Sequence, residues 1–390
     1  MKRRAIFLIH LVQDVAVLRP LAVMAARDFG FETVLLVSTR FLARDASGIW
    51  RSELQHLAAA TGARLEYFAN LFEARPHLVA DGLIFSASES SLPQHALSHD
   101  LFKSAPAGLV KVTVQHGYEC VGFRQNADHE RSHGGTATFA ADILCAWSSV
   151  DDPTAMPRSQ RPKVVVTGPP AVLQLPVAVN ERGAAAPGLV CENLHSVRFK
   201  GSSKSRSEFV VRFGEFAQQM KERGRQVTLR AHPGGQYSIR NKIELPSNVT
   251  MDNAPLYRVD LRQFAYGVSA PSSVLVDMLL AGIPTAVWQD QSKAMDTTNY
   301  SGLPQVSSTR EWVDFAREAE NDPGPLIAAQ SRFLNSSGMP LDPRDVFHRF
   351  AGLFTAVLRK DIDAVGPVDF RDKYSNNVDE RPDTPKSRTE

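Results

Sequence analysis

The chain has 390 residues, of which 43% are hydrophobic and 22% are charged, and its formal net charge is +2 at pH 7. This length predicts about two domains with buried cores, and the small net charge gives no sign of a nucleic-acid partner. Three scattered cysteines without CxxC spacing exclude a disulfide framework and a zinc knuckle, and they favour a reducing compartment. No apolar run reaches the ~18–20 residues of a membrane span, so we expect a cytoplasmic protein.

Short apolar runs alternate with helical periodicity through the first half of the chain. The run at 5–10 follows basic residues and imitates a signal peptide, but it is short and has no cleavage site. It indicates a parallel strand that is covered on both faces. Alternating strands and helices predict βαβ units. Further strands are expected over 33–37, 64–68, 82–85, 110–114 and 143–147, with helices over 15–29, 49–60 and 94–102.

The second half repeats the pattern after a strand at 163–167 and a linker-like segment at 173–187. We expect an α/β protein of two Rossmann-like, doubly wound domains, 1–165 and 166–361, with ligands in the cleft beyond the strand ends. The polar tail 362–390 indicates a disordered segment or a linker. Strands are expected over 188–191, 226–231, 249–251, 264–268 and 285–288, with helices over 207–223, 273–281, 310–319 and 343–359.

Arg230, His232, Pro233 and Gly234 follow an expected strand of the second half. Arginine and histidine donate to phosphate oxygens. Proline stiffens the turn, and glycine lets backbone N–H groups approach an anion. The alternative is a β-turn with a surface histidine. Neither GxGxxG nor GxxxxGK[ST] is present, which argues against a Rossmann dinucleotide site and a P-loop.

Ser272 and Ser273 stand before the expected helix at 273–281. Capping a helix is the ordinary role of such serines. Two hydroxyls with free N–H groups and the helix dipole also make an anion site. Together with His232, they predict a site for a nucleotide-activated donor.

Two segments at strand ends offer groups for chemistry. Glu119 is a candidate general acid or base, with His116 beside it, and a solvated loop carboxylate is the alternative. Glu192 and Asn193 follow the first strand of the second half, where Glu192 would oppose Glu119 across the cleft. Retaining sugar chemistry uses two carboxylates, and Asn193 cannot serve as one.

His10 and Asp14 end the first strand and are candidates for acceptor binding, with helix capping by Asp14 as the alternative. His129 and His133 have metal-like spacing, but no third ligand is in register. We therefore expect no metal.

The pair His232-Pro233 and Ser272-Ser273 resembles the HP and SS motifs of bacterial CMP-sugar transferases with the GT-B fold, which include sialyltransferases and Kdo transferases. The CDP-glycerol polymerases carry similar elements. Four further segments look like the retaining β-Kdo transferase domain of WbbB-type O-antigen enzymes. These segments are 10–14, 115–123, 167–169 and 191–196.

The resemblance implies a GT-B enzyme with a CMP-β-Kdo donor and no cofactor. It implies transfer of Kdo with retention, through a Kdo–enzyme adduct, to a lipid-linked O-antigen or capsule glycan at the inner-membrane face. Glu119 matches the acid/base. The family's nucleophile is an aspartate and Asn193 matches it best, so either Glu192 is the relevant group or the nucleophile has been replaced. The expected donor residues are Arg230, His232, Pro233, Gly234, Ser272, Ser273, Gly168 and Pro169, and the acceptor residues are His10, Asp14 and His116.

Three alternatives stay open. A sialyltransferase or a CDP-polyol phosphotransferase would have the same donor motifs. A UDP-sugar transferase or epimerase of the same fold would normally offer a glutamate to the nucleotide ribose, which we do not find in the sequence. A catalytically inactive sugar-nucleotide-binding module would suit Asn193.

Overall fold

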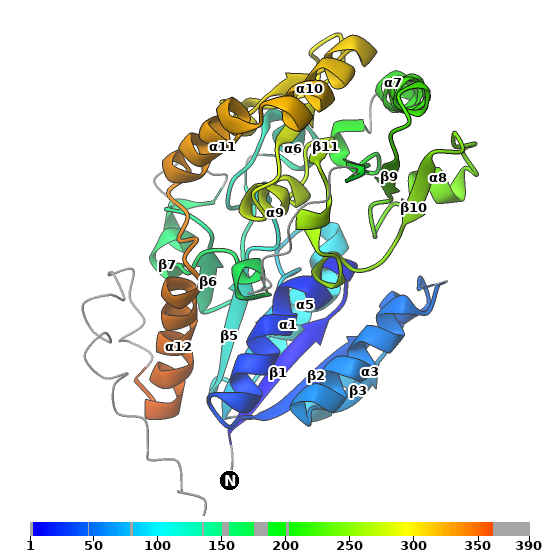
Figure 1. Cartoon of the computed structure of the whole chain (residues 1–390). Coiled ribbons are helices and arrows are strands. Elements are labelled where there is room, and N and C mark those ends of the chain that lie inside the picture. Colours follow the sequence, from blue (N-terminus) through cyan, green and yellow to red (C-terminus); the bar gives the residue numbers. More distant parts are fainter. Residues whose placement is uncertain are drawn as a thin grey trace, which may run out of the picture.

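The computed structural model describes residues 3–45, 47–78, 81–134, 136–149, 156–174, 186–199 and 203–361. Two parallel sheets form two domains, the first low and the second high in Figure 1. The predicted tail 362–390 and most of the predicted linker lie outside the described residues. No helix in the described part of the chain is long and apolar enough to cross a bilayer.

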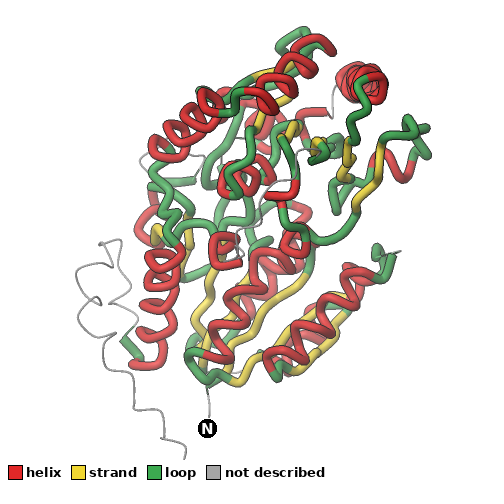
Figure 2. The backbone as a smooth tube through the Cα atoms, in the orientation of Figure 1, coloured by secondary structure: helices red, strands yellow, loops and turns green. Residues whose placement is uncertain are grey.

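The first sheet has seven parallel strands in the order β3-β2-β1-β4-β5-β6-β7. Its central strands are apolar along their length because helices cover both faces, and α1 and α3 lie over one face in Figure 2. Strand pairing sets Ala5 against Thr33 and Leu83. The strands are β1 (Arg4–Ile9), β2 (Glu32–Ser38), β3 (Arg64–Phe68), β4 (Gly82–Ser86), β5 (Leu109–Val114), β6 (Ile143–Ala146) and β7 (Val164–Val166). The helices are α1 (Val12–Arg27), α2 (Thr39–Leu42), α3 (Ile49–Thr61), α4 (Leu71–Ala74), α5 (Ala96–Ser104) and α6 (Ala127–His133).

The second sheet has six parallel strands in the order β10-β9-β8-β11-β12-β13. Aromatic side chains fill its core: the Phe209 ring lies 5.1 Å from Trp288, and Phe216 lies 5.3 Å from Trp312. The strands are β8 (Gly188–Cys191), β9 (Val227–Arg230), β10 (Val249–Asp252), β11 (Tyr266–Ser269), β12 (Thr285–Trp288) and β13 (Gln305–Val306). The helices are α7 (Ser203–Glu222), α8 (Tyr237–Arg240), α9 (Val274–Leu280), α10 (Thr309–Asn321) and α11 (Gly324–Ser336).

The last helix, α12 (Pro343–Arg359), returns to the first domain and corrects the predicted domain limits. It begins at Asp342, whose carboxylate accepts hydrogen bonds from the N–H groups of Arg344 and Asp345 at 2.8 and 3.0 Å. Phe354 is fully buried there, 5.6 Å from the ring of Phe85 on β4. In Figure 1, α12 stands beside the first sheet, below α11. The segment 166–361 is therefore not one domain.

The strand order reverses once in each sheet, and ligands of such sheets bind at these switch points. In the first sheet, Asp14 joins the loops after β1 and β4. Its carboxylate accepts hydrogen bonds from the N–H groups of His10, Leu11 and Ala87 at 2.8, 2.7 and 3.2 Å. In the second sheet, the loops after β8 and β11 are joined by Asn193, whose Nδ2 donates to the carbonyl of Pro271 at 2.6 Å. Each switch point is thus held by one side chain.

The place of α12 in the first core can be tested by stability. We expect Phe354→Ala to lower the free energy of unfolding by about 3–5 kcal/mol, because it opens a cavity against Phe85 and Phe29. The control Leu358→Ala lies on the same helix with 39% exposure, and we expect a loss below about 1 kcal/mol. Urea unfolding measures both, and equal losses would contradict the packing.

Candidate functional site

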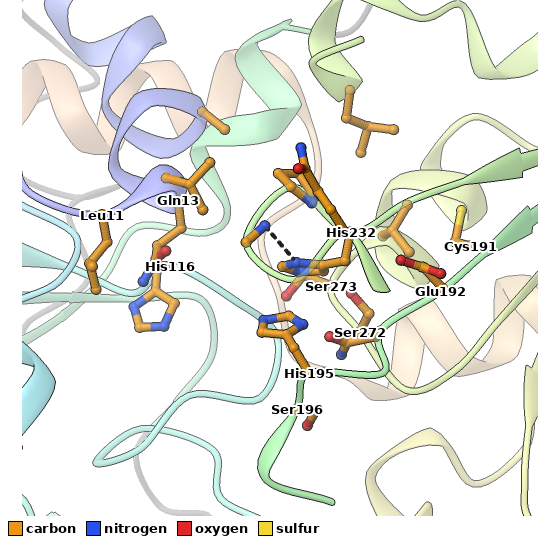
Figure 3. A pocket seen from close by; sticks show the side chains of 18 of the residues that line it. Leu11, Gln13, His116, Cys191, Glu192, His195, Ser196, His232, Ser272 and Ser273 are labelled. Carbon is orange, nitrogen blue, oxygen red and sulfur yellow. Dashed lines mark hydrogen bonds between the residues drawn. The ribbon is translucent and has the colours of Figure 1, made fainter. Parts of the chain in front are cut away.

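A cavity of about 700 Å³ lies between the domains, at the carboxyl ends of both sheets (Figure 3). Its volume is within the usual range of small-molecule sites. Both domains contribute polar groups. The first domain supplies His10, His95, His116 and Glu119, and the second supplies Glu192, Asn193, His195, Arg230, His232, Ser272 and Asp277.

His232 is held as a neutral hydrogen-bond donor. Its Nδ1 accepts a hydrogen bond from the N–H of Gly234 at 3.0 Å, the dashed line in Figure 3, so the ring proton is on Nε2. The ring of His195 lies 4.0 Å away. Burial lowers the pKa of His232 well below its usual range, and His195 and Arg230 lower it further. Burial also lowers the pKa of His195 to about 4. Both shifts favour the uncharged imidazoles, although His195 is exposed to solvent and His232 is half-buried.

Glu192 shapes the loop that carries His232. Its carboxylate accepts hydrogen bonds from the N–H of Ser238 at 3.1 Å and from the Ser238 hydroxyl. Burial raises the pKa of Glu192, and the bonds from Ser238 oppose this shift. Gly235 is needed in the same loop because a Cβ there would lie 2.7 Å from His195 Cβ. Glu192 thus lines the cavity, and its carboxylate also fixes the turn between His232 and Ser238.

Arg230 places a positive charge beside His232. It is 5% exposed, and its Nη1 lies 3.6 Å from the Asp252 carboxylate, beyond hydrogen-bond distance. Asp277 on α9 also lines the cavity. Burial raises the pKa of Asp277 to about 7 against the opposing effect of Arg230. The second domain therefore presents a cation, a neutral donor and a weakly acidic carboxyl group.

Ser272 and Ser273 both line the cavity, as predicted, but Ser273 has a second partner. Its Oγ accepts a hydrogen bond from the N–H of Tyr118 in the first domain at 3.0 Å. A Cβ on Gly117 would lie 2.5 Å from this Oγ. The loop after β5 therefore meets the start of α9 at close range, which sequence reasoning missed.

Glu119 lies in a buried ion pair between the domains. Its Oε2 lies 2.5 Å from the guanidinium of Arg198, and Asn299 Nδ2 donates to its Oε1 at 2.9 Å. The side chains of Glu119 and Arg198 are 4% and 2% exposed. Both oxygens of the Glu119 carboxylate therefore already accept hydrogen bonds in this arrangement. Arg198 was not predicted, because it follows β8 in a segment with no motif and its partner is 79 residues away.

Comparisons with known proteins match the architecture alone. No protein-family model and no curated protein sequence matches the chain. The S. aureus MnaA–UDP structure superposes with a TM-score of 0.56 at 13% identity, over 92% of this chain and 97% of that one. UDP-GlcNAc 2-epimerase from Neisseria meningitidis, bound to UDP-GlcNAc, superposes with a TM-score of 0.53 at 11% identity, over 92% of this chain and 100% of that one. The glycotransferase of kitacinnamycin superposes with a TM-score of 0.51 at 12% identity, over 90% of this chain and 99% of that one.

The chain has the GT-B fold. The predicted α/β class with two doubly wound, Rossmann-like domains is confirmed. At sequence identities of 11–13%, these similarities show a shared fold, and they do not show that the chain shares the activity of those proteins.

Three predicted site residues lie away from the GT-B cleft lining as far as the chain is described. Asp14 is fully buried, and its carboxylate oxygens accept hydrogen bonds from backbone N–H groups. This arrangement fits the capping of α1, which was the alternative to acceptor binding. Gly168 has a φ of +78°, and a Cβ there would lie 2.5 Å from the carbonyl of Pro340. Gly168 and Pro169 therefore form a turn that packs before α12, outside the lining of the cleft where a donor role was predicted.

The other predicted residues do line the cleft, namely His10, His116, Pro233 and Gly234. His116 Nδ1 lies 2.6 Å from the carbonyl of Ala87 and 3.5 Å from the sulfur of Cys120. Burial disfavours the charged imidazole, but Cys120, the Ala87 carbonyl and Asp14 together raise the pKa of His116 to about 9. These contacts favour the protonated imidazole of His116 on the cavity wall of the first domain.

His129 and His133 also line the cleft, from α6. Within the residues that the structure describes, no group of three or more histidine, cysteine, aspartate or glutamate side chains could hold a metal ion.

The contact between Gly117 and Ser273 can be tested by coupling. Gly117→Ala should destabilise the protein by about 1–3 kcal/mol, because the new Cβ displaces the Ser273 hydroxyl. In a Ser273→Ala background the same change should cost clearly less, because the Oγ is gone. A double-mutant cycle in urea measures the difference. Equal costs in both backgrounds would show that the two domains do not meet here.

Proposed function

We propose that the chain is a glycosyltransferase that uses a CMP-activated acidic sugar, Kdo, as its donor. One observation carries this proposal: Arg230 and the Nε2–H of neutral His232 stand together on the cavity wall of the second domain. The HP and SS resemblance, the GT-B fold and the size of the cavity support it.

The leaving group of such a transfer is CMP, whose phosphate gains negative charge as the glycosidic bond breaks. Arg230 would neutralise that charge, and His232 would donate a hydrogen bond without itself being charged. Donors that are fixed in advance stabilise developing charge at little reorganisation cost. The bond from Gly234 to Nδ1 provides this fixation, because it sets both the tautomer and the direction of the ring.

The acceptor would enter from the first domain, where His10 and His116 line the opposite wall. We propose a sugar of a lipid-linked O-antigen or capsule glycan, with the protein at the inner-membrane face. Glu119 would serve as the base once the acceptor displaces it from Arg198.

A UDP-sugar enzyme, including a 2-epimerase, is the second candidate. It is favoured by the solved structures, two of which are named as UDP or UDP-GlcNAc complexes. The first candidate is preferred because the HP and SS motifs resemble those of CMP-sugar enzymes.

The donor can be identified with a panel of CMP-Kdo, CMP-sialate, CDP-glycerol and UDP-GlcNAc. We expect nucleotide release from CMP-Kdo, and a fall of about 100-fold or more for His232→Ala, in line with the loss of one preorganised donor. His348→Ala, an exposed histidine on α12, is the control and should keep full turnover. Turnover of another member of the panel in place of CMP-Kdo would replace the proposed donor, and unchanged release by His232→Ala would remove this histidine from the site.

Retention of configuration by double displacement requires a carboxylate that attacks the anomeric carbon as CMP leaves and is later displaced by the acceptor oxygen. Glu192 is the candidate in the 192–193 segment, since Asn193 has no carboxylate. Incubation with CMP-Kdo should add the mass of one Kdo to the protein, and Glu192→Gln should abolish this adduct. Ser238→Ala loosens the same turn but keeps the carboxylate, so it should still form the adduct. Loss of the adduct in both variants would instead give Glu192 a structural role.

A further inference from the structure

The buried polar atoms without a hydrogen-bond partner among the described residues include two on the cavity wall of the second domain, Asn193 Oδ1 and Arg230 Nη1. Arg230 Nη1 lies in an ion pair with Asp252 at 3.6 Å, beyond hydrogen-bond distance. Asn193 is 8% exposed and Arg230 is 5% exposed, and both residues line the cavity. Buried polar groups are nearly always satisfied, so unpaired ones at a cavity wall are sites where a bound ligand or a water can form hydrogen bonds. Asn193 Oδ1 is free to accept a hydrogen bond, and Arg230 Nη1 is free to donate one.

The orientation of the Asn193 amide is set by its neighbour. Nδ2 lies 2.6 Å from the carbonyl oxygen of Pro271, a contact that only the NH₂ side of the amide can make. Oδ1 is therefore a fixed acceptor. An aspartate here would place a carboxylate oxygen against the Pro271 carbonyl, where two acceptors repel each other. The local structure thus fits an amide and not a carboxylate.

The two switch points differ in whether the side chain that joins their loops has a free hydrogen-bonding atom. In the first domain, the side chain that joins the loops is Asp14, and both of its oxygens are occupied by backbone N–H groups. In the second domain, Asn193 uses its donor to join the loops after β8 and β11 and keeps its acceptor free. The second switch point therefore offers one free acceptor, Asn193 Oδ1, to a hydroxyl of a bound ligand.

We propose that Asn193 is a specificity-determining residue that accepts a hydrogen bond from a hydroxyl of the donor substrate, and that it is not a nucleophile position from which a carboxylate has been lost. Arg230 and His232 donate hydrogen bonds, so they suit the phosphate oxygens, which only accept hydrogen bonds. The acceptor at Asn193 therefore suits the hydroxylated part of the sugar nucleotide. This inference rests on the proposed function, since it needs a sugar nucleotide in the cavity.

The test compares Asn193→Ala and Asn193→Asp with the wild type. Calorimetric titration with CMP, 2′-deoxyCMP and CMP-Kdo measures affinity. We expect Asn193→Ala to weaken binding of CMP-Kdo by about 10- to 100-fold. Asn193→Asp should weaken it more, because its charge faces both the Pro271 carbonyl and the phosphate. A loss seen already with CMP, and smaller with 2′-deoxyCMP, assigns a ribose hydroxyl, whereas a loss with CMP-Kdo alone assigns a hydroxyl of the sugar.

Asn241→Asp is the matched control. Its amide also donates to a backbone carbonyl, that of Tyr237 at 2.8 Å, but it is exposed on the surface. It should bind all three ligands like the wild type. Urea midpoints of all variants separate folding from binding.

Two results would overturn the inference. One is unchanged affinity of Asn193→Ala for all three ligands. The other is faster transfer or a new covalent adduct in Asn193→Asp, which would mean that a nucleophile had been restored. Failure of the wild type to bind any of the three ligands would instead refute the proposed function itself.

Discussion

The hydrogen bond from Asn193 to the carbonyl of Pro271 joins the two loops that flank the switch point of the second sheet. One of these loops continues into Ser272 and Ser273, and the other begins with Glu192, which holds the turn behind His232. The three polar segments of the cavity wall therefore depend on one another. A short contact between two buried loops brings residues from distant parts of the chain into a single site.

The cleft also depends on contacts that cross it. Ser273 accepts a hydrogen bond from Tyr118, and Glu119 pairs with Arg198 where both side chains are almost fully buried. Separating a buried ion pair leaves uncompensated charge, so these contacts favour the closed arrangement. The helix α12 adds a second connection, because it carries the chain from α11 back to the core of the first domain. The walls of the cavity are thus held at a defined separation.

Sequence reasoning predicted the strands of both sheets well, except the two-residue β13, because continuous apolar runs are the mark of strands covered on both faces. It also placed His232 at a strand end, where the fold needs ligand-binding groups. It could not predict Arg198, whose role arises from a partner 79 residues away. It misassigned Gly168 and Asp14, since a glycine turn and a strand-end carboxylate look alike in sequence whether they serve a ligand or the backbone.

We propose that the nucleotide binds at the switch point of the second domain and not at that of the first. Hydrogen exchange with and without CMP tests it most directly, because exchange reports on each loop separately. We expect slower exchange of the amides at 192–195, 231–236 and 271–274 when CMP is present. Slower exchange confined to 10–13 and 87–92 of the first domain, with the second-domain loops unaffected, would contradict it.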